Sequence, residues 1–205
     1  MAFPGISKVA LFLDVDITLT RKPVQSVYAQ CLNCHDEYSN LERDLGTGAI
    51  NSQEFGRNLV DLFASRGFTK NAAKKFYPRV EKQSWVSINL NRSVDVFLVS
   101  AGPDYFVELL AKDLIIPAHR VLSSTYAFCD RTGIVNACIA VTPEDKAAFV
   151  RRHAGRYSAL IGIGDCSRSD GPFLAACTIG LLYNPQDDMG NGAAGAEFRF
   201  LDSML

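Results

Sequence analysis

Four runs of apolar residues stand out along the chain, and each is six or seven residues long. They predict buried β-strands, because near-continuous apolar runs are typical of strands that are covered on both faces. The runs are KVALFL (8–13), VDVFLV (94–99), SALIGIG (158–164) and CTIGLLY (177–183), and FRFL (198–201) is a shorter fifth candidate. The pattern favours a parallel sheet.

Helical patterns lie between these runs, over 103–114 and 143–153. Pro103 opens the first, and the second has Thr142 as N-cap and Pro143 at its first position. Alternation of strands and helices predicts an α/β fold with right-handed crossovers, that is, a doubly wound parallel sheet. The segments 120–128 and 133–141, joined by CDRTG, predict a β-hairpin that projects from the sheet or extends its edge.

The segment 21–92 interrupts this rhythm, since it contains no strand-like run. It predicts one helix across 24–45, one that opens at Asn51 in a capping box with Glu54, and one after Thr69. We therefore expect residues 1–20 and 93–205 to form an α/β core, and 21–92 to form a small helical domain inserted after the first strand.

Composition narrows the functional classes. The chain has 205 residues, 48% hydrophobic content and a formal net charge of -1, so its charge implies neither nucleic acid nor an anionic membrane as partner. Asp14 ends the first apolar run well short of a signal or membrane segment, which favours a cytoplasmic protein. The six cysteines are too sparse for a disulfide scaffold, and reduced thiols are expected.

Chemistry-bearing residues follow the predicted strands. The first run ends in Asp14 and Asp16, the second in Ser100 and Gly102, the third in Asp165 and Asp170, and Lys146 begins the helix that leads into the third. In open α/β sheets, ligands bind beyond the carboxyl ends of the strands, so these side chains are expected to converge at one edge.

This set favours phosphoryl transfer. Clustered carboxylates need a hard cation such as Mg²⁺, while a hydroxyl, free backbone N–H groups near Gly102 and an ammonium form a cradle for phosphate. Asp14 is the candidate nucleophile and Asp16 the candidate general acid and base. Lys146 and Mg²⁺ then reduce the repulsion between the Asp14 carboxylate and a phosphate dianion.

The order of these motifs resembles the haloacid dehalogenase (HAD) superfamily, and within it the phosphatases similar to phosphoserine phosphatase. The matching stretches are DVDITLT (14–20), VSAG (99–102), Lys146 in PEDKAAF and GDCSRSD (164–170), and the resemblance covers about two-thirds of the chain. It implies a Rossmann-like core and names the insertion as a helical cap that closes over the site.

The resemblance also implies residue roles. Asp14, the main-chain carbonyl of Asp16 and Asp165 would ligate Mg²⁺, with Asp170 supporting the metal site. The phosphoryl group would be held, or the nucleophile oriented, by Thr18, Ser100, Ala101, Gly102 and Lys146. Arg21, Lys22 and Arg57 are candidate specificity residues.

Asp16 favours phosphate esters over haloacids, because halide displacement needs no protonation of the leaving group. The sequence TRKPVQ lacks the glutamate that phosphoserine phosphatases usually carry shortly after the first motif, so phosphoserine is in doubt as substrate. The sequence thus predicts a Mg²⁺-dependent phosphatase for a small phosphorylated metabolite, acting through an aspartyl-phosphate. A phosphotransferase or phosphomutase, and a non-catalytic phosphate-binding protein, remain alternatives, and the oligomeric state is open.

Other motifs carry less weight. CLNCH (31–35) matches a c-type haem attachment signature but falls inside a predicted helix, and helix packing is the better reading. GIGDCS (162–167) lacks the third glycine of a dinucleotide fingerprint. The three histidines bear no relation to a serine nucleophile motif. A receiver domain would be shorter and would have no cap.

Overall fold

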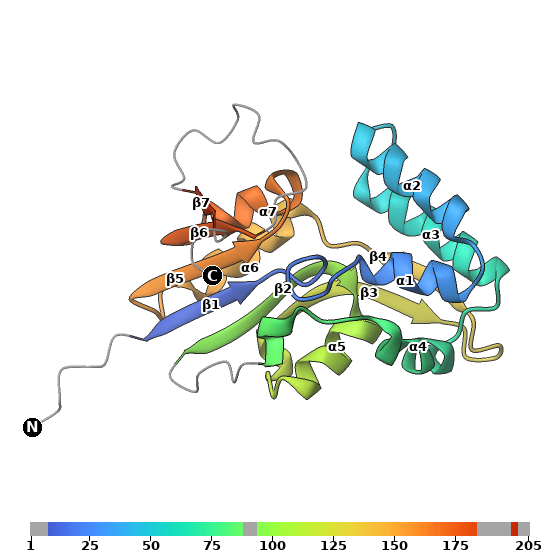
Figure 1. Cartoon of the computed structure of the whole chain (residues 1–205), viewed down its shortest axis with the longest axis horizontal. Coiled ribbons are helices and arrows are strands. Elements are labelled where there is room, and N and C mark those ends of the chain that lie inside the picture. The colour runs from blue at the N-terminus through green and yellow to red at the C-terminus, as the bar shows by residue number, and fades with distance from the viewer. Residues whose placement is uncertain (1–7, 88–93, 184–197, 201–205) are drawn as a thin grey trace, which may run out of the picture.

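A seven-stranded sheet forms the centre of the computed structural model, which describes residues 8–87, 94–183 and 198–200 (Figure 1). Neighbouring strands are parallel except for the antiparallel edge pair β3 and β4. The predicted hairpin therefore extends the sheet edge. The strands are β1 (Val9–Leu13), β2 (Asp95–Pro103), β3 (Val121–Phe128), β4 (Val135–Ile139), β5 (Ala159–Gly164), β6 (Ile179–Leu182) and β7 (Phe198–Phe200).

The strand order β4-β3-β2-β1-β5-β6-β7 confirms the doubly wound α/β fold. The chain moves outward from β1 through β2 to β3, and later returns to the other side of β1 at β5. The direction of winding thus reverses between β1 and β5. Ligands of open α/β sheets bind beyond the carboxyl ends of the strands at such a switch point.

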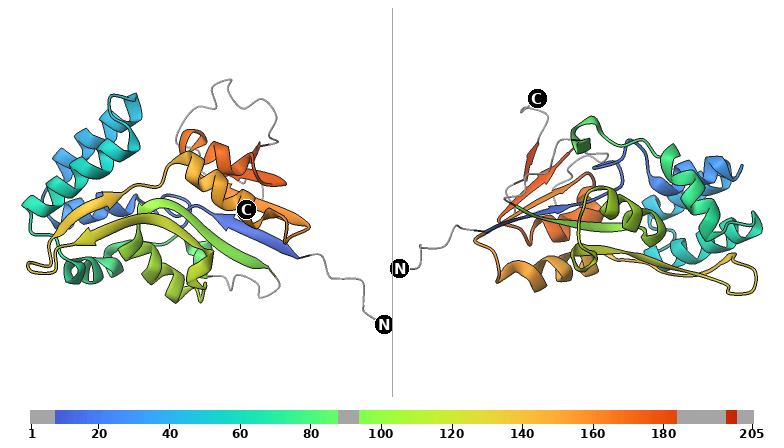
Figure 2. Two further views of the ribbon diagram at one scale, coloured as in Figure 1. Left: turned by 180° about the vertical axis from the view of Figure 1, so that it is seen from behind. Right: turned by 90° about the horizontal axis from the view of Figure 1, so that it is seen from below.

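Helices cover both faces of this sheet (Figure 2). Leu13 and Leu98 belong to the core cluster on the side of α5, whereas Phe12 and Phe97 pack on the side of α6 and α7, with ring centroids 4.6 Å apart. This alternation follows the two-residue period of a strand and explains why β1 and the stretch 96–99 of β2 are apolar on both faces. The covering helices are α5 (Asp104–Asp113), α6 (Pro143–Ala154) and α7 (Ser167–Leu174).

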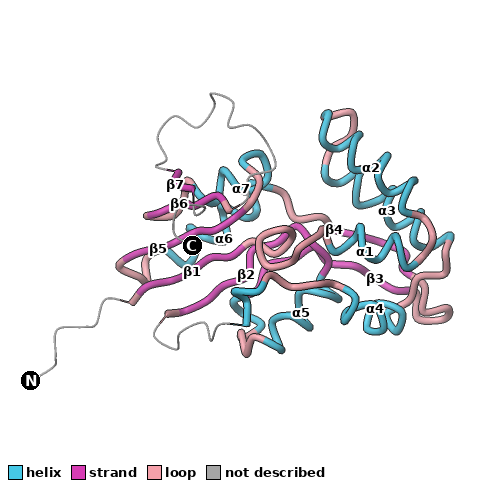
Figure 3. Tube along the Cα trace, in the orientation of Figure 1, coloured by secondary structure: helices cyan, strands magenta, loops and turns pink. Residues whose placement is uncertain are grey.

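Four helices lie between β1 and β2 in the chain, and α2 and α3 form a pair that stands out from the rest of the molecule (Figure 3). Asn51 and Glu54 form the predicted capping box of α3, and Thr69 caps α4. None of the described helices has the length and apolar character needed to cross a membrane. The helices are α1 (Val24–Cys31), α2 (His35–Thr47), α3 (Ser52–Ser65) and α4 (Lys70–Phe76), with 3-10 turns at Tyr77–Arg79, Ser84–Ser87 and, after α5, Ala118–Arg120.

The prediction of one helix across 24–45 is wrong, because the chain turns between α1 and α2. Asn33 has φ 53°, a left-handed conformation that asparagine adopts more readily than most residues and that ends a helix. The CLNCH motif therefore lies at a helix break. The ring nitrogens of His35 contact the hydroxyls of Ser26 and Ser39, and Cys34 is buried as a free thiol, which favours a packing role.

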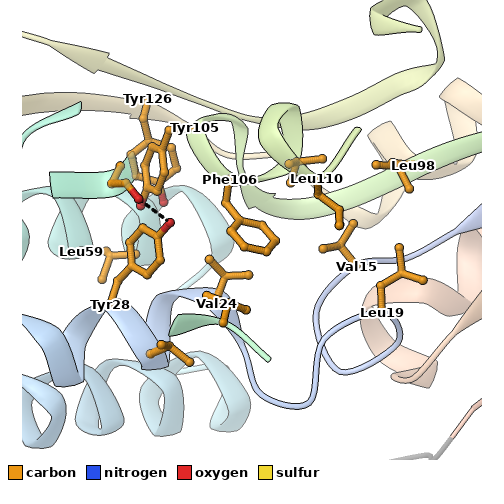
Figure 4. Packing of buried hydrophobic residues seen from close by; sticks show 14 of the residues in the cluster. Val15, Leu19, Val24, Tyr28, Leu59, Leu98, Tyr105, Phe106, Leu110 and Tyr126 are labelled. Carbon is orange, nitrogen blue, oxygen red and sulfur yellow. Dashed lines mark hydrogen bonds between the residues drawn. The ribbon is translucent and has the colours of Figure 1, made fainter. Parts of the chain in front are cut away.

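The inserted helices share a hydrophobic core with α5 and the hairpin (Figure 4). The ring of Tyr28 in α1 stacks on Tyr105 of α5 at 5.7 Å, and Phe68 before α4 meets Tyr105 edge-on at 5.3 Å. Tyr126 of β3 packs on the same ring at 5.2 Å. The α1 and α4 part of the insertion is thus fixed to the sheet domain. The predicted end of the inserted domain, between residues 92 and 93, lies outside the described residues and stays a prediction.

Candidate active site

The first acidic residue of the site, Asp14, directly continues β1. Its backbone N–H donates to the carbonyl of Ile163 in β5 at 2.8 Å, so the strand pairing holds it at the switch point. The residue is only 4% exposed. A carboxylate with so little water needs a charged partner or a ligand.

That partner is Lys146, in the first turn of α6. Its Nζ lies 2.7 Å from Asp14 Oδ1 and 2.7 Å from Asp170 Oδ1, and its side chain is 2% exposed. The helix begins where the sequence predicts, since Thr142 accepts from the Asp145 N–H and the Asp145 carboxylate accepts from the Thr142 N–H. This capping box at the start of α6 fixes the helical turn from which Lys146 reaches the two acids.

Asp170 is the most enclosed acid of the site. Its Oδ2 accepts from the backbone N–H groups of Asp165, at 3.1 Å, and Cys166, at 3.2 Å. These bonds tie the start of α7 to the end of β5. Gly164 makes this possible, because a Cβ at that position would lie 2.5 Å from Asp170 Oδ2.

The carboxylates of Asp14, Asp165 and Asp170 offer oxygens that all lie within 4.8 Å of one another, and all three residues are buried. Lys146 supplies one positive charge against them. Oxygen-only donors with an excess of negative charge suit a hard divalent cation such as Mg²⁺. These residues therefore fit the metal site that the sequence predicts.

The pKa values reflect this crowding. Burial, and then the neighbouring Asp170, raises the pKa of Asp14 well above its usual value. Burial followed by Asp170 and Asp16 raises the pKa of Asp165 to about 8. Burial alone would lower the pKa of Lys146, but the carboxylates of Asp14 and Asp170 outweigh it and raise that pKa. The site is thus short of positive charge.

Asp16 sits in a tight turn after β1. Its Oδ1 accepts from the N–H of Val24 at the start of α1, at 2.6 Å, and its carbonyl accepts from the N–H of Thr18, at 2.7 Å. Ile17 between them has φ 64°, a strained conformation for a β-branched residue. Burial, opposed by the Val24 N–H, raises the pKa of Asp16 to about 6.

Ser100 and Gly102 lie at the carboxyl end of β2, as predicted, but the N–H of Gly102 itself is not one of the free N–H groups expected near this residue. This N–H donates to Ser100 Oγ at 2.8 Å and is already satisfied. A Cβ at Gly102 would lie 2.6 Å from Asp16 Oδ2 and 2.9 Å from Ser100 Oγ. The glycine therefore allows β2 to approach the Asp16 carboxylate closely.

A cavity of about 260 Å³ opens over these residues. Asp14, Asp16, Ala101, Lys146 and Asp165 line one side. Thr18 and Ser100 are fully buried and do not line it, and Thr18 Oγ1 has no hydrogen-bond partner among the described residues. The far walls come from the inserted helices and the hairpin, including Gln25, Tyr38, Glu42, Phe55, Ser124 and Tyr126.

The candidate specificity residues Arg21, Lys22 and Arg57 are all exposed, and none of them lines this cavity. Arg21 instead faces Glu81, with 3.7 Å between charged atoms. Sequence reasoning missed Tyr38 and Glu42, which do line it. Their spacing of four residues places them on one helix face, but the pattern alone does not say which face meets the site.

Comparison with known proteins supports the fold. No family model and no curated protein matches the sequence. A HAD family hydrolase from Salmonella enterica serovar Typhi superposes with a TM-score of 0.77 at 14% identity, over 89% of this chain and 65% of that chain. The chain thus spans less than two-thirds of that protein.

Two structures of phosphoserine phosphatase cover both chains more evenly. A phospho-aspartyl intermediate analogue has a TM-score of 0.73 at 16% identity, and a substrate-bound complex has 0.74 at 15%, each over 88% of both chains. At these identities the likeness establishes the fold. It confirms the HAD-like α/β core expected from the order of the motifs.

Proposed function

We propose that this protein is a Mg²⁺-dependent phosphatase that hydrolyses a small phosphomonoester through an aspartyl-phosphate on Asp14. The observation that carries the proposal is the position of the Asp14 carboxylate. It lies at the switch point of a HAD-like sheet, is held by Lys146, belongs to a buried acid cluster and lines a cavity. The phosphoserine phosphatase neighbours of known structure share this fold.

Asp14 is proposed to act as nucleophile. Lys146 holds Oδ1, which leaves Oδ2 as the attacking atom. A bond forms between this oxygen and phosphorus while the bond from phosphorus to the alcohol oxygen breaks. Burial and Asp170 raise the pKa of Asp14, and the positive charge of Lys146 acts in the opposite direction and favours the ionised nucleophile.

Asp16 is proposed to donate a proton to the departing alcohol oxygen. Its pKa of about 6 suits a group that gives up and regains a proton near neutral pH. Once ionised, it accepts a proton from the water that attacks the aspartyl-phosphate, and this attack releases phosphate and regenerates the Asp14 carboxylate. The Val24 N–H holds Asp16 in place through both steps.

The Asp14 and Asp165 carboxylates, with the Asp16 carbonyl, would hold Mg²⁺. When bound, the cation offsets the repulsion between the nucleophile and a phosphate dianion. Asp170 positions Lys146 and the backbone of Asp165. We further propose that α1 to α4 act as a cap, since residues from α1, α2 and α3 line the far side of the cavity.

The test is release of inorganic phosphate from a panel of small phosphomonoesters, with Mg²⁺ and with EDTA. We expect turnover with Mg²⁺, loss of at least about 10²-fold with EDTA, and recovery when Mg²⁺ is restored. Turnover at the same rate with EDTA as with Mg²⁺, or no turnover of any ester in the panel, would contradict the proposal. An added acceptor alcohol separates hydrolysis from phosphoryl transfer to a second substrate.

Gly102→Ala tests the geometry around Asp16. The new Cβ would lie 2.6 Å from Asp16 Oδ2, so the proposed acid and base must move. We expect kcat/KM to fall by about 10²-fold, because displacements of about 1 Å in an active site cost that much. Gly155→Ala is the matched control, since a Cβ there meets nothing within 4 Å. Equal activity of both variants would refute this role of Gly102.

A further inference from the structure

The far wall of the cavity carries an acid that is held in place. Tyr38 and Glu42 lie on one face of α2, and the Tyr38 hydroxyl donates to Glu42 Oε1 at 2.5 Å. Tyr38 is only 1% exposed, whereas Glu42 is half-buried, and both line the cavity. The hydrogen bond to a packed tyrosine restricts the Glu42 carboxylate to one orientation.

Uncharged polar groups lie on the neighbouring walls. Gln25 of α1 donates from Nε2 to the Tyr126 hydroxyl of β3 at 3.4 Å, and both residues are buried at the edge of the cavity. Ser52 and Ser124 add hydroxyl groups to the lining. These groups can form hydrogen bonds with the hydroxyls of a small alcohol, while Leu45 and Phe55 add apolar surface to the same lining.

The charges of the described lining are one-sided. Its acids are Asp14, Asp16, Asp165 and Glu42, and its only cation is Lys146. Both hydrogen bonds of Lys146 go to Asp14 and Asp170. A second anionic group on a substrate, beyond the phosphate that reacts, would therefore meet no cation on the described walls and would face Glu42.

Glu42 lines the same cavity as Asp16. The charge of Glu42 adds to the effect of burial, which raises the pKa of Asp16. Asp16 is the group proposed to protonate the departing oxygen, so the alcohol half of the ester lies between Asp16 and the wall formed by α2. The side chains that α2 offers to this alcohol half thus include one acid, Glu42.

We propose that Glu42, positioned by Tyr38, selects phosphomonoesters whose alcohol half is neutral or cationic, and rejects those that carry a carboxylate or a second phosphate. This rests on the proposed phosphatase function. An unpaired anion beside a fixed carboxylate is repelled, whereas an ammonium or hydroxyl donates to it. Phosphoserine, with a carboxylate on its alcohol half, is a poor substrate on this basis.

The test uses three esters of similar size: glycerol phosphate, phosphoethanolamine and phosphoglycolate, whose alcohol halves are neutral, cationic and anionic. We expect the wild type to turn over the first two with kcat/KM at least about 10-fold above the third. Glu42→Gln should lower kcat/KM for phosphoethanolamine and raise kcat/KM for phosphoglycolate. The ratio of these two kcat/KM values should therefore fall by about 10-fold. Tyr38→Phe should lower the same ratio by a smaller factor, and the change should appear in KM.

Glu37→Gln is the matched control, because Glu37 lies on the same helix but faces Arg66, 2.7 Å away, and is exposed. It should leave the ratio unchanged. Wild-type values within twofold for all three esters, or a ratio that Glu42→Gln does not alter, would overturn the proposal.

The affinities of the same esters for Asp14→Asn, measured by calorimetry, separate this proposal from the phosphatase function. One outcome is that the wild type hydrolyses no ester, yet Asp14→Asn binds the cationic and neutral esters more tightly than the anionic one, and adding Glu42→Gln removes this preference. The phosphatase function would then be wrong, and the selection by Glu42 would stand. Affinities without that order, beside normal turnover by the wild type, would overturn the selection and leave the phosphatase function intact.

Discussion

Asp14→Asn is expected to lower the rate of phosphate release by at least about 10⁴-fold, as loss of a nucleophile does in other covalent mechanisms. The asparagine keeps an oxygen that accepts from Lys146 and nearly the same volume, so the 2.7 Å contact and the packing around it survive. What disappears is the anionic oxygen that attacks phosphorus. The variant should therefore fold, and the loss should appear in kcat.

The measurement is phosphate release with the best ester of the panel, beside a thermal unfolding curve for each protein. The wild type, incubated with an ester labelled in its phosphoryl group and then quenched with acid, should retain the label on the protein. The variant should retain none. Asp130→Asn, at an exposed hairpin position, is the control and should match the wild type. A variant that keeps more than about a tenth of the activity would mean that Asp14 is not the nucleophile.

The sequence predicts the acid cluster of this site well, because the positions of these acids depend on where the buried strands end. A buried strand is readable from its apolar run, and parallel strands bring their carboxyl ends to one edge. Asp14 and Asp165 follow β1 and β5 directly, so their meeting required only the pairing of those two strands. Lys146 needed one more step, the helix start set by Thr142.

The walls of the cavity are less readable. Which face of α2 meets the site depends on the turn at Asn33, which the helical pattern hides, and on the packing of Tyr28 and Phe68 against α5. A glutamate on a helix is usually solvated, so nothing in the pattern distinguishes Glu42 from Glu37. The hydrogen bond from the Gly102 N–H to Ser100 Oγ is unreadable for a similar reason, since such a local bond leaves no trace in a motif.

Lys146→Met is expected to abolish turnover and to destabilise the metal-free protein by about 3–5 kcal/mol near neutral pH, since it leaves buried carboxylates without their cation. Methionine replaces the lysine chain as far as Cε with apolar atoms and removes only the Nζ, which lies 5.7 Å from the centroid of the Phe173 ring. The loss therefore reports the missing charge. Lys82→Met is the matched control, because the pair of Lys82 and Asp113, 2.9 Å apart, lies at the surface. Such surface pairs contribute about 0–1 kcal/mol.

The pH dependence of this loss has a definite sign. Burial raises the pKa of Asp14, and raises that of Asp165 to about 8, and Lys146 opposes both shifts. Without the lysine these pKa values rise further, so the folded variant binds more protons than its unfolded chain, and its stability falls as pH rises through the folded values. The wild-type pKa of Asp165 is already about 8, so urea unfolding of the metal-free proteins should show a gap from wild type that widens as pH rises through about 8. Mg²⁺ should narrow the gap at about pH 8, because it supplies the cation that the variant lacks. A cost that is as small as that of Lys82→Met, or that is constant with pH, would mean that the buried acids do not depend on Lys146 for their charge.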